Sequence, residues 1–197
     1  MIHKHNLVPA TQFGGRPGSS TVDAALMFTH DIEAACNHGL VTTSLTIDIK
    51  GFFDYVNHNK LTSIMCRKQV LLPMVKWVSS FLSNREAAIC LDGHISDSRP
   101  VENGIPQGSL ISPALSILYA SPVYKEFQAR LATRYVHQVP PTTKLTPTTL
   151  IGYIDDVNIY TSLTSLLQNV LEYKWTIYAY LLAYISARAH YSRVRVT

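Results

Sequence analysis

Three acidic residues in two distant stretches of the chain could together bind metal ions. Asp48 follows the apolar residues of LTID, and Asp155 and Asp156 are adjacent in GYIDDVNIY. If these stretches pair, two carboxylates about 4 Å apart would repel by roughly 4 kcal/mol at an effective dielectric near 20. Such a cluster requires protonation or cations, and oxygen ligands alone select Mg²⁺ or Mn²⁺. Because two such ions could activate a hydroxyl and neutralise a leaving phosphate, phosphoryl transfer is the natural reaction class.

Each acid also has an ordinary interpretation. A single strand-end aspartate such as Asp48 can simply be solvated, and adjacent acids such as Asp155 and Asp156 are common in surface turns. A charge near a core, however, is costly unless it is paired or bound to metal. The acid pair stands between two apolar runs, and this setting gives the metal interpretation its weight.

Two strand-forming stretches must position these acids. The alternation of apolar and polar residues in LTIDI predicts a strand with one buried face, which Gly51 ends. Residues 149–154 and 157–161 are β-rich and predict a hairpin with Asp155 and Asp156 at its tip. If this hairpin pairs beside the first strand, all three acids converge at one sheet edge.

Apolar residues at helical spacing predict helices around these strands. One helix, about Val22 to His38, follows the glycine-rich stretch QFGGRPGSS. Shorter helices follow Asn57 and begin at Pro73, and Trp77 is expected to pack in this helical layer. The residues expected to face inward are Val22, Ala25, Leu26, Ile32 and Ala35 in the first helix, Leu61, Ile64 and Met65 in the second, and Val75, Val78, Phe81 and Leu82 in the third.

Two further segments are expected at the surface. Residues 87–91 predict a strand that enters a hairpin through Asp92-Gly93, a common two-residue turn pair. Between Arg134 and Thr149, prolines among threonines predict a loop that carries little chemistry.

The composition is that of a globular chain with a mild basic excess. Its 197 residues are 47% hydrophobic and 15% charged, which argues against disorder. A net charge of +4 is compatible with a polyanionic partner without requiring one. Three separated cysteines, without metal-site spacing, predict a reducing compartment and no disulfide-linked partner. No signal peptide is recognised, and the apolar stretch 175–187 falls short of the roughly 20 residues that span a bilayer, so no membrane partner is expected.

The acid-bearing stretch LTIDIKGFFDYVNH resembles the first palm motif of reverse transcriptase domains of non-LTR (LINE-type) retrotransposons. The resemblance implies that Asp48 is a metal ligand. It implies that Phe53 stacks under the incoming sugar and excludes a 2′-hydroxyl, and that Asp54 is structural. Phe53 could instead be plain core, as most buried aromatics are.

Three other motifs are similar to the same family and occur in the same order. In the aromatic-x-Asp-Asp motif from Tyr153 to Asp156, Asp155 would be the surer metal ligand and Asp156 the less direct one. The Pro-Gln-Gly turn that contains Gln107 and Gly108 would lie against the nascent base pair and template. The further site residues that the resemblance implies are Tyr153 at the primer and, in QFGGRPGSS, Arg16 near template or triphosphate. Tyr153 could instead pack in its strand, Gln107 could satisfy loop backbone, and Arg16 could cap a helix or meet solvent.

We therefore predict an α+β polymerase palm, a small antiparallel sheet backed by helices on one face, with partial fingers and no thumb. The family's upstream basic segment and downstream thumb are not recognised, so the domain is expected to be truncated at both ends. The expected parts are a reverse transcriptase-like domain at 1–161, with palm at 45–58 and 106–161 and partial fingers and fingers/palm helices at 1–44 and 59–105, and a divergent helical tail at 162–197.

Two principal function classes stay open. The first is an RNA-directed DNA polymerase domain, with an RNA template, a DNA primer and dNTP as partners and Mg²⁺ or Mn²⁺ as cofactor. Its expected location is intracellular, and nuclear if the resemblance holds. The second is a catalytically inactive retroelement remnant with at most residual nucleic-acid binding. A metal-dependent phosphodiesterase is a third class, disfavoured because no catalytic His or Lys accompanies the acids at motif spacing.

Overall fold

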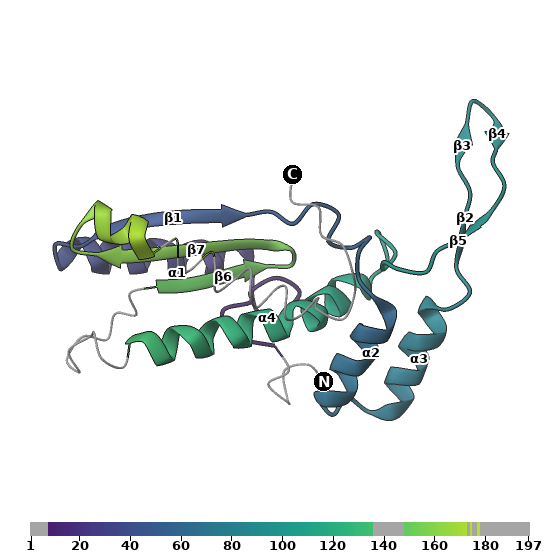
Figure 1. Ribbon diagram of the computed structural model, residues 1–197, viewed down its shortest axis with the longest axis horizontal. Coiled ribbons are helices and arrows are strands. Elements are labelled where there is room, and N and C mark those ends of the chain that lie inside the picture. The colour runs from purple at the N-terminus through teal and green to yellow at the C-terminus, as the bar shows by residue number, and fades with distance from the viewer. Residues whose placement is uncertain (1–7, 136–147, 173, 175–176, 178–197) are drawn as a thin grey trace. The chain divides into compact units, whose positions relative to one another are not determined.

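A three-stranded antiparallel sheet carries the predicted catalytic acids. In this computed structural model, which describes residues 8–135, 148–172, 174 and 177, the sheet has the order β1-β7-β6 (Figure 1). Strand β7 is central and pairs antiparallel with both neighbours. The strands are β1 (Val41–Ile47), β6 (Thr148–Tyr153) and β7 (Asp156–Leu163).

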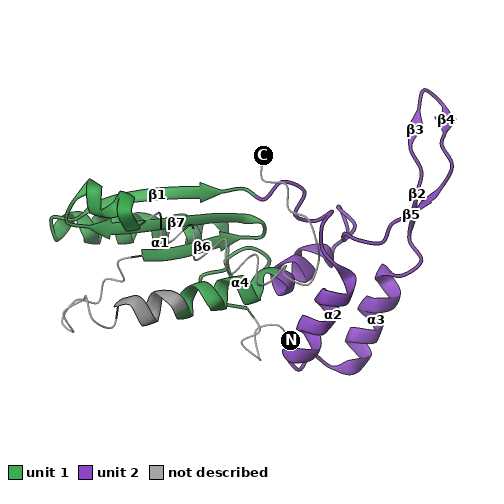
Figure 2. Ribbon diagram, in the orientation of Figure 1, with its two compact units in different colours: residues 1–48, 120–197 green, residues 49–119 purple. Residues whose placement is uncertain are grey.

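The chain divides into two compact units, each described by itself below (Figure 2). The first contains Met1–Asp48 and Ala120–Thr197, and therefore the sheet. The second contains Ile49–Tyr119. Helices and small antiparallel sheets together confirm the predicted α+β class. The predicted loop between Arg134 and Thr149 and most of the predicted tail lie outside the described residues.

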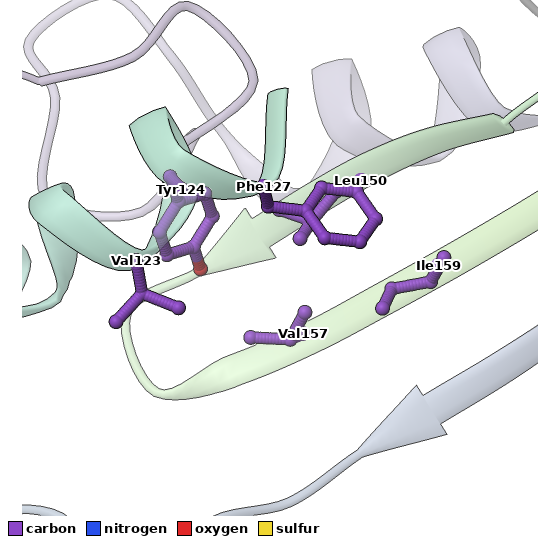
Figure 3. Packing of buried hydrophobic residues seen from close by; sticks show 6 residues of the cluster. All are labelled: Val123, Tyr124, Phe127, Leu150, Val157 and Ile159. Atoms are coloured by element: carbon purple, nitrogen blue, oxygen red, sulfur yellow. The ribbon is translucent and has the colours of Figure 1, made fainter. Parts of the chain in front are cut away.

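The core of the first unit lies between α4 (Ser112–Tyr135) and one face of the sheet (Figure 3). Phe127, at 0% exposure, lies at the centre of this cluster. Alternate residues of a strand point to the same face, so Leu45 and Ile47 of the edge strand β1 lie on this face and are partly buried. The clustered residues are Val123, Tyr124 and Phe127 of α4 and Leu150, Val157 and Ile159 of the sheet.

Helix α1 (Thr21–Asn37) packs on the opposite face, so the expectation of helices on one face is corrected. Its Phe28 meets Tyr160 edge to face, with ring centroids 5.0 Å apart. The Tyr160 hydroxyl donates to Asp31 Oδ2 at 2.5 Å. Because Tyr160 follows Ile159 in β7, its side chain points away from the face that packs on α4. Helices therefore lie on both faces of the sheet, and α1 leaves part of its face exposed, including Ser44 and Thr46.

The predicted apolar face of α1 is wrong in part. Val22 and Leu26 are 63% and 61% exposed, whereas Ala35 is buried as expected. The helix begins as the sequence predicts, because Ser20 caps it and exchanges hydrogen bonds with Asp23. These bonds lower the pKa of the Asp23 carboxyl below its ordinary value. The contacts of Phe28 with the sheet set the rotation of the helix, and apolar spacing alone did not reveal them.

The second unit contains two of the predicted helices, α2 (His58–Arg67) and α3 (Leu72–Leu82). All three predicted inward residues of α2 are buried, as are three of the four in α3. Trp77 is 51% exposed, and its stacking on Phe81, with centroids 5.4 Å apart, replaces the predicted packing in the helical layer. The buried side chains are Leu61, Ile64 and Met65 in α2 and Val75, Val78 and Leu82 in α3.

A narrow hairpin follows α3, as the sequence predicts. Its turn is Asp92-Gly93, with φ values of 50° and 79°, and positive φ at both central residues is typical of a type I′ turn. The predicted strand over residues 87–91 is interrupted at residues 88–89. The strands are β2 (Glu86–Ala87), β3 (Cys90–Leu91), β4 (His94–Ile95) and β5 (Arg99–Pro100), of which β2 pairs with β5 and β3 with β4.

The segment after β7 is anchored to the sheet in its first part. Residues 166–172 are helical. Asn169 is fully buried and its Nδ2 donates to Val41 O at 2.7 Å and to Thr43 Oγ1 at 2.8 Å. This part of the expected tail therefore belongs to the first unit. Within the described residues, no helix is long and apolar enough to cross a membrane.

Candidate active site

The register of the sheet brings Asp48 opposite Asp156. Ile47 of β1 pairs with Val157 of β7; Asp48 follows Ile47, and Asp156 precedes Val157. Continued by one residue past its last pair, this antiparallel register would place the two acids opposite each other, and the charge of Asp48 does act on Asp156. The pairing that the sequence required for a shared site is therefore present in the fold.

A row of polar side chains leads along the same face to these acids. Thr46 pairs with Asn158, and Asn158 Nδ2 donates to Thr46 Oγ1 at 3.2 Å. Ser44 Oγ donates to Asn158 Oδ1 at 2.9 Å. Because residues two apart share a face, Asp48 and Asp156 continue this row. The face presents an exposed polar strip that ends in negative charge.

The three carboxylates interact electrostatically. Partial loss of hydration, followed by the charges of Asp155 and then Asp48, raises the pKa of Asp156 above its ordinary value. Asp156 is nonetheless exposed at the end of the sheet, so water and ions can reach it. Two neighbouring carboxylates disfavour ionisation of this carboxyl group, and a bound cation would favour its ionised form.

The carboxylate oxygens of these acids are the kind of ligand that a hard divalent ion prefers. Among the described residues, however, no three His, Cys, Asp or Glu side chains form a group that could hold a metal ion by themselves. Mg²⁺ is usually bound by one or two carboxylates together with substrate phosphates and water. The acids at this end of the sheet therefore offer the kind of ligand that such an ion takes from a protein, one or two carboxylates.

The turn that carries Asp155 is one residue away from its predicted place. Tyr153 pairs with Asp156, so Ile154 and Asp155 form the turn and Asp156 begins β7. Ile154 has φ of 59°, in the left-handed region, where a side chain costs roughly 1–2 kcal/mol. Positive φ at the first of two turn residues is typical of a type II′ hairpin, which normally has glycine there. The hairpin is confirmed, and only Asp155 lies in its turn.

Gln12, whose role the sequence patterns did not reveal, lies against this turn. Its side chain is 1% exposed, and its Nε2 donates to Ile154 O at 3.4 Å. Its backbone forms a parallel bridge with Gly152 of β6. The available signal was the glycine-rich stretch around Gln12, because glycine marks places where another backbone approaches closely.

Arg16 forms hydrogen bonds with the backbone of the same loop. Its Nη1 donates to the carbonyl oxygens of Pro9 at 3.2 Å, Ala10 at 2.8 Å and Gln12 at 3.3 Å. These bonds fold the loop back on itself. The expected contact of Arg16 with template or triphosphate stays a prediction.

The remaining predicted site residues lie in the second unit. The backbone of Phe53 accepts from Ile105 N at 2.8 Å, and its ring meets that of Phe52 with centroids 6.2 Å apart. Gln107 Nε2 reaches Asp54 Oδ1 at 3.5 Å, a weak hydrogen bond. The first palm motif and the Pro-Gln-Gly turn are therefore joined within this unit, which agrees with a structural role for Asp54.

Close backbone packing holds this junction. A Cβ on Gly104 would lie 2.8 Å from Asp54 O, and Gly104 O accepts from Arg85 Nη1 at 2.9 Å and lies 2.7 Å from His58 Nε2. Gly108 has φ of 83° and open space around it. Its backbone is thus free for a close approach by a ligand, although its predicted contact with template stays a prediction.

Solved structures show the same fold. A structure of telomerase from Candida tropicalis in complex with a TWJ fragment of telomeric RNA covers 82% of this chain and 27% of its own, with a TM-score of 0.56 and 13% identity. Apo telomerase from Candida tropicalis, truncated from the C-terminal domain, covers 85% of this chain and 32% of its own, with a TM-score of 0.57 and 17% identity.

Curated relatives from Drosophila melanogaster are named as polymerases of mobile elements. The probable RNA-directed DNA polymerase from transposon X-element is 30% identical over 120 residues, 61% of this chain and 13% of the relative. The one from transposon BS is 28% identical over 158 residues, 80% of this chain and 16% of the relative. The chain therefore spans about one sixth or less of the length of these relatives.

The match to a family is broader than these pairwise similarities. It covers residues 1–177, and so extends past residue 161, the boundary that the motifs set. It includes the acids of the sheet, the glycine-rich loop and the Pro-Gln-Gly turn. The resemblance first drawn from four ordered motifs is confirmed: the chain belongs to the family of reverse transcriptases (RNA-dependent DNA polymerases).

Proposed function

We propose that this chain is the part of an RNA-directed DNA polymerase that carries the catalytic acids. The primer 3′-hydroxyl would attack the α-phosphate of dNTP and release pyrophosphate, so that the primer grows as a copy of an RNA template. One observation carries the proposal: in a member of this family, the β1–β7 register brings Asp48 opposite Asp156 and next to the turn with Asp155. An intracellular, nuclear location belongs to the same proposal.

Members of this family depend in general on a divalent metal. Asp48 and Asp155 would hold Mg²⁺ or Mn²⁺, and Asp156 would contribute mainly through its charge. The ion, when bound, would neutralise phosphate charge and make the attacking hydroxyl more acidic. The chain's own part is to hold these carboxylates at the end of a rigid sheet, and the raised pKa of Asp156 supports a site that favours cations.

The other predicted residues have roles in binding. Phe53 would lie beneath the sugar of the incoming nucleotide, and Gln107 and Gly108 against the nascent base pair. Tyr153, which pairs with Asp156, would lie near the primer. A polar strip of Ser44, Thr46 and Asn158 offers a hydrogen-bonding surface beside the acids.

The second candidate is a remnant without catalysis that binds nucleic acid at most. The absence, in the described part of the chain, of a group of three side chains able to hold a metal is the observation that favours it. Primer extension separates the two candidates. The substrate is poly(rA)/oligo(dT) with dTTP, in Mg²⁺ and in Mn²⁺, with the wild-type chain beside Asp155→Asn and Asp48→Asn.

A matched control is Asp92→Asn, because Asp92 lies in a type I′ turn of the second unit where Asn is equally suited. Incorporation by the wild type and by Asp92→Asn, lost in both other variants, supports the polymerase. No incorporation by a folded wild-type chain contradicts it and supports the remnant.

A further inference from the structure

We propose that Gln12 is a positioning residue that fixes the turn bearing Asp155. Together with the loop of residues 9–16, which we call the clamp loop, it would hold the Asp155 carboxylate in place for cation binding. The inference rests on the proposed function, because Gln12 would position a residue of that same site.

The backbone of the clamp loop is bonded to the catalytic hairpin. Phe13 N donates to Gly152 O at 2.8 Å, and Gly152 N donates to Thr11 O at 2.9 Å. Because β7 occupies one edge of β6, these bonds use the other edge. The clamp loop thus acts as a one-residue extra strand, two residues before the turn.

The side chain of Gln12 continues this contact to the turn itself. It is 1% exposed, and its amide donates a long hydrogen bond to Ile154 O at 3.4 Å. Its Oε1 is buried and has no hydrogen-bond partner among the described residues. Burying an amide is costly unless it is hydrogen-bonded, so an apolar side chain would fill this space at lower cost. The bond to the turn carbonyl is the contact that an apolar residue could not make.

Two glycines allow the loop and the hairpin to approach this closely. A Cβ on Gly14 would lie 2.5 Å from Ile154 N and 2.7 Å from Ile154 Cγ1. A Cβ on Gly152 would overlap Gln12 Oε1 and the hydroxyl of Tyr124. The clamp loop therefore lies close against the turn at Gly14 and against β6 at Gln12.

The turn needs such support because of its conformation. Ile154 is β-branched and has φ of 59°, and residues in this region persist only where their surroundings hold them. Arg16 in turn holds the clamp loop through three carbonyl oxygens. A connected set of contacts thus runs from Arg16 through Gln12 to Ile154, which is adjacent to Asp155.

Amide hydrogen exchange on the full chain tests the proposal without relying on activity. In the wild type, the amides of Phe13 and Gly152 should be protected to a degree comparable with those in the centre of β7. In Gln12→Met, exchange over residues 152–157 should be faster by about tenfold, while exchange in α1 and β1 stays unchanged. The matched control is Gln168→Met, which changes an exposed glutamine beyond β7.

Steady-state kinetics provide a second measurement if the wild-type chain polymerises. Gln12→Met should lower kcat by about tenfold with little change in the KM for dTTP, because a positioning defect acts on the reacting centre rather than on nucleotide binding. Gly14→Ala keeps Gln12 but crowds Ile154, so it should loosen residues 152–157 as well.

The outcomes are distinguishable. Rapid exchange of Phe13 and Gly152 in the wild type overturns the proposal even if a variant fails to fold. The proposal is also overturned if Gln12→Met and Gly14→Ala both fold and their amides at residues 152–157 exchange as slowly as those of the wild type. A wild type that shows the expected protection but no incorporation leaves the clamp intact and contradicts the polymerase assignment alone.

Discussion

Asp48 and Asp156 stand opposite each other where β1 ends and β7 begins, although more than a hundred residues separate them in the sequence. This relationship follows from the pairing of Ile47 with Val157, whose side chains meet the α4 core on the other face. The core therefore determines the register, and the register determines which acids share the exposed face.

The titration of Asp156 should be visible in the stability of the chain. Its pKa is raised, so the folded chain holds this proton more tightly than the unfolded chain does. Stability should therefore fall as pH rises from the ordinary Asp value through the raised one, and stay lower above it. Urea unfolding without divalent ions, between about pH 3 and pH 7, measures this change.

Asp156→Asn should reduce this part of the pH dependence, and Asp48→Asn should reduce it partially, since Asp48 is the weaker of the two neighbouring charges. Asp97→Asn, on the exposed hairpin of the second unit, is the control and should leave the profile as in the wild type. An Asp156→Asn profile identical to the wild type would contradict the assignment.

Tyr160→Phe should destabilise the first unit by about 1–3 kcal/mol, because it removes the donor to Oδ2 of the partly buried Asp31 carboxylate. Burial, and next the hydrogen bond to Asp31, raises the pKa of the Tyr160 phenol, so the hydroxyl keeps its proton and donates at neutral pH. Tyr55→Phe, at a residue that is 63% exposed, is the control. Chemical denaturation measures both variants, and equal stabilities would show that the bond between α1 and β7 contributes little.

Phe127→Ala should cost about 3–5 kcal/mol, because the side chain is fully buried where α4 packs on β6 and β7. Leu110→Ala, at a fully exposed site, should stay within about 0.5 kcal/mol of the wild type. If register depends on this core, the remaining folded fraction of Phe127→Ala should also lose protection of the β7 amides. Retained protection would mean that strand pairing alone fixes the register.

Sequence patterns predicted the strands, the hairpins and helices α2 and α3, because each has a local period or turn signal. The turn of the catalytic hairpin was placed one residue late, since Ile154 carries no local signal for positive φ. Gln12 escaped notice because glutamine is mostly exposed in proteins, and only contacts with a distant hairpin bury it. Val22 and Leu26 look like core residues by spacing, yet the sheet meets Phe28 and Asp31 instead. In each case a partner far away in the sequence decided the outcome.

The central claim is that Asp48 and Asp155 belong to one cation site, and Mn²⁺ binding followed by electron paramagnetic resonance tests it most directly. Even indirect partners of a metal site change affinity about 10- to 100-fold. We therefore expect Asp48→Asn and Asp155→Asn each to weaken Mn²⁺ binding by at least about tenfold, while Asp92→Asn binds like the wild type. Mn²⁺ affinity that neither substitution changes, in folded variants, would contradict the account.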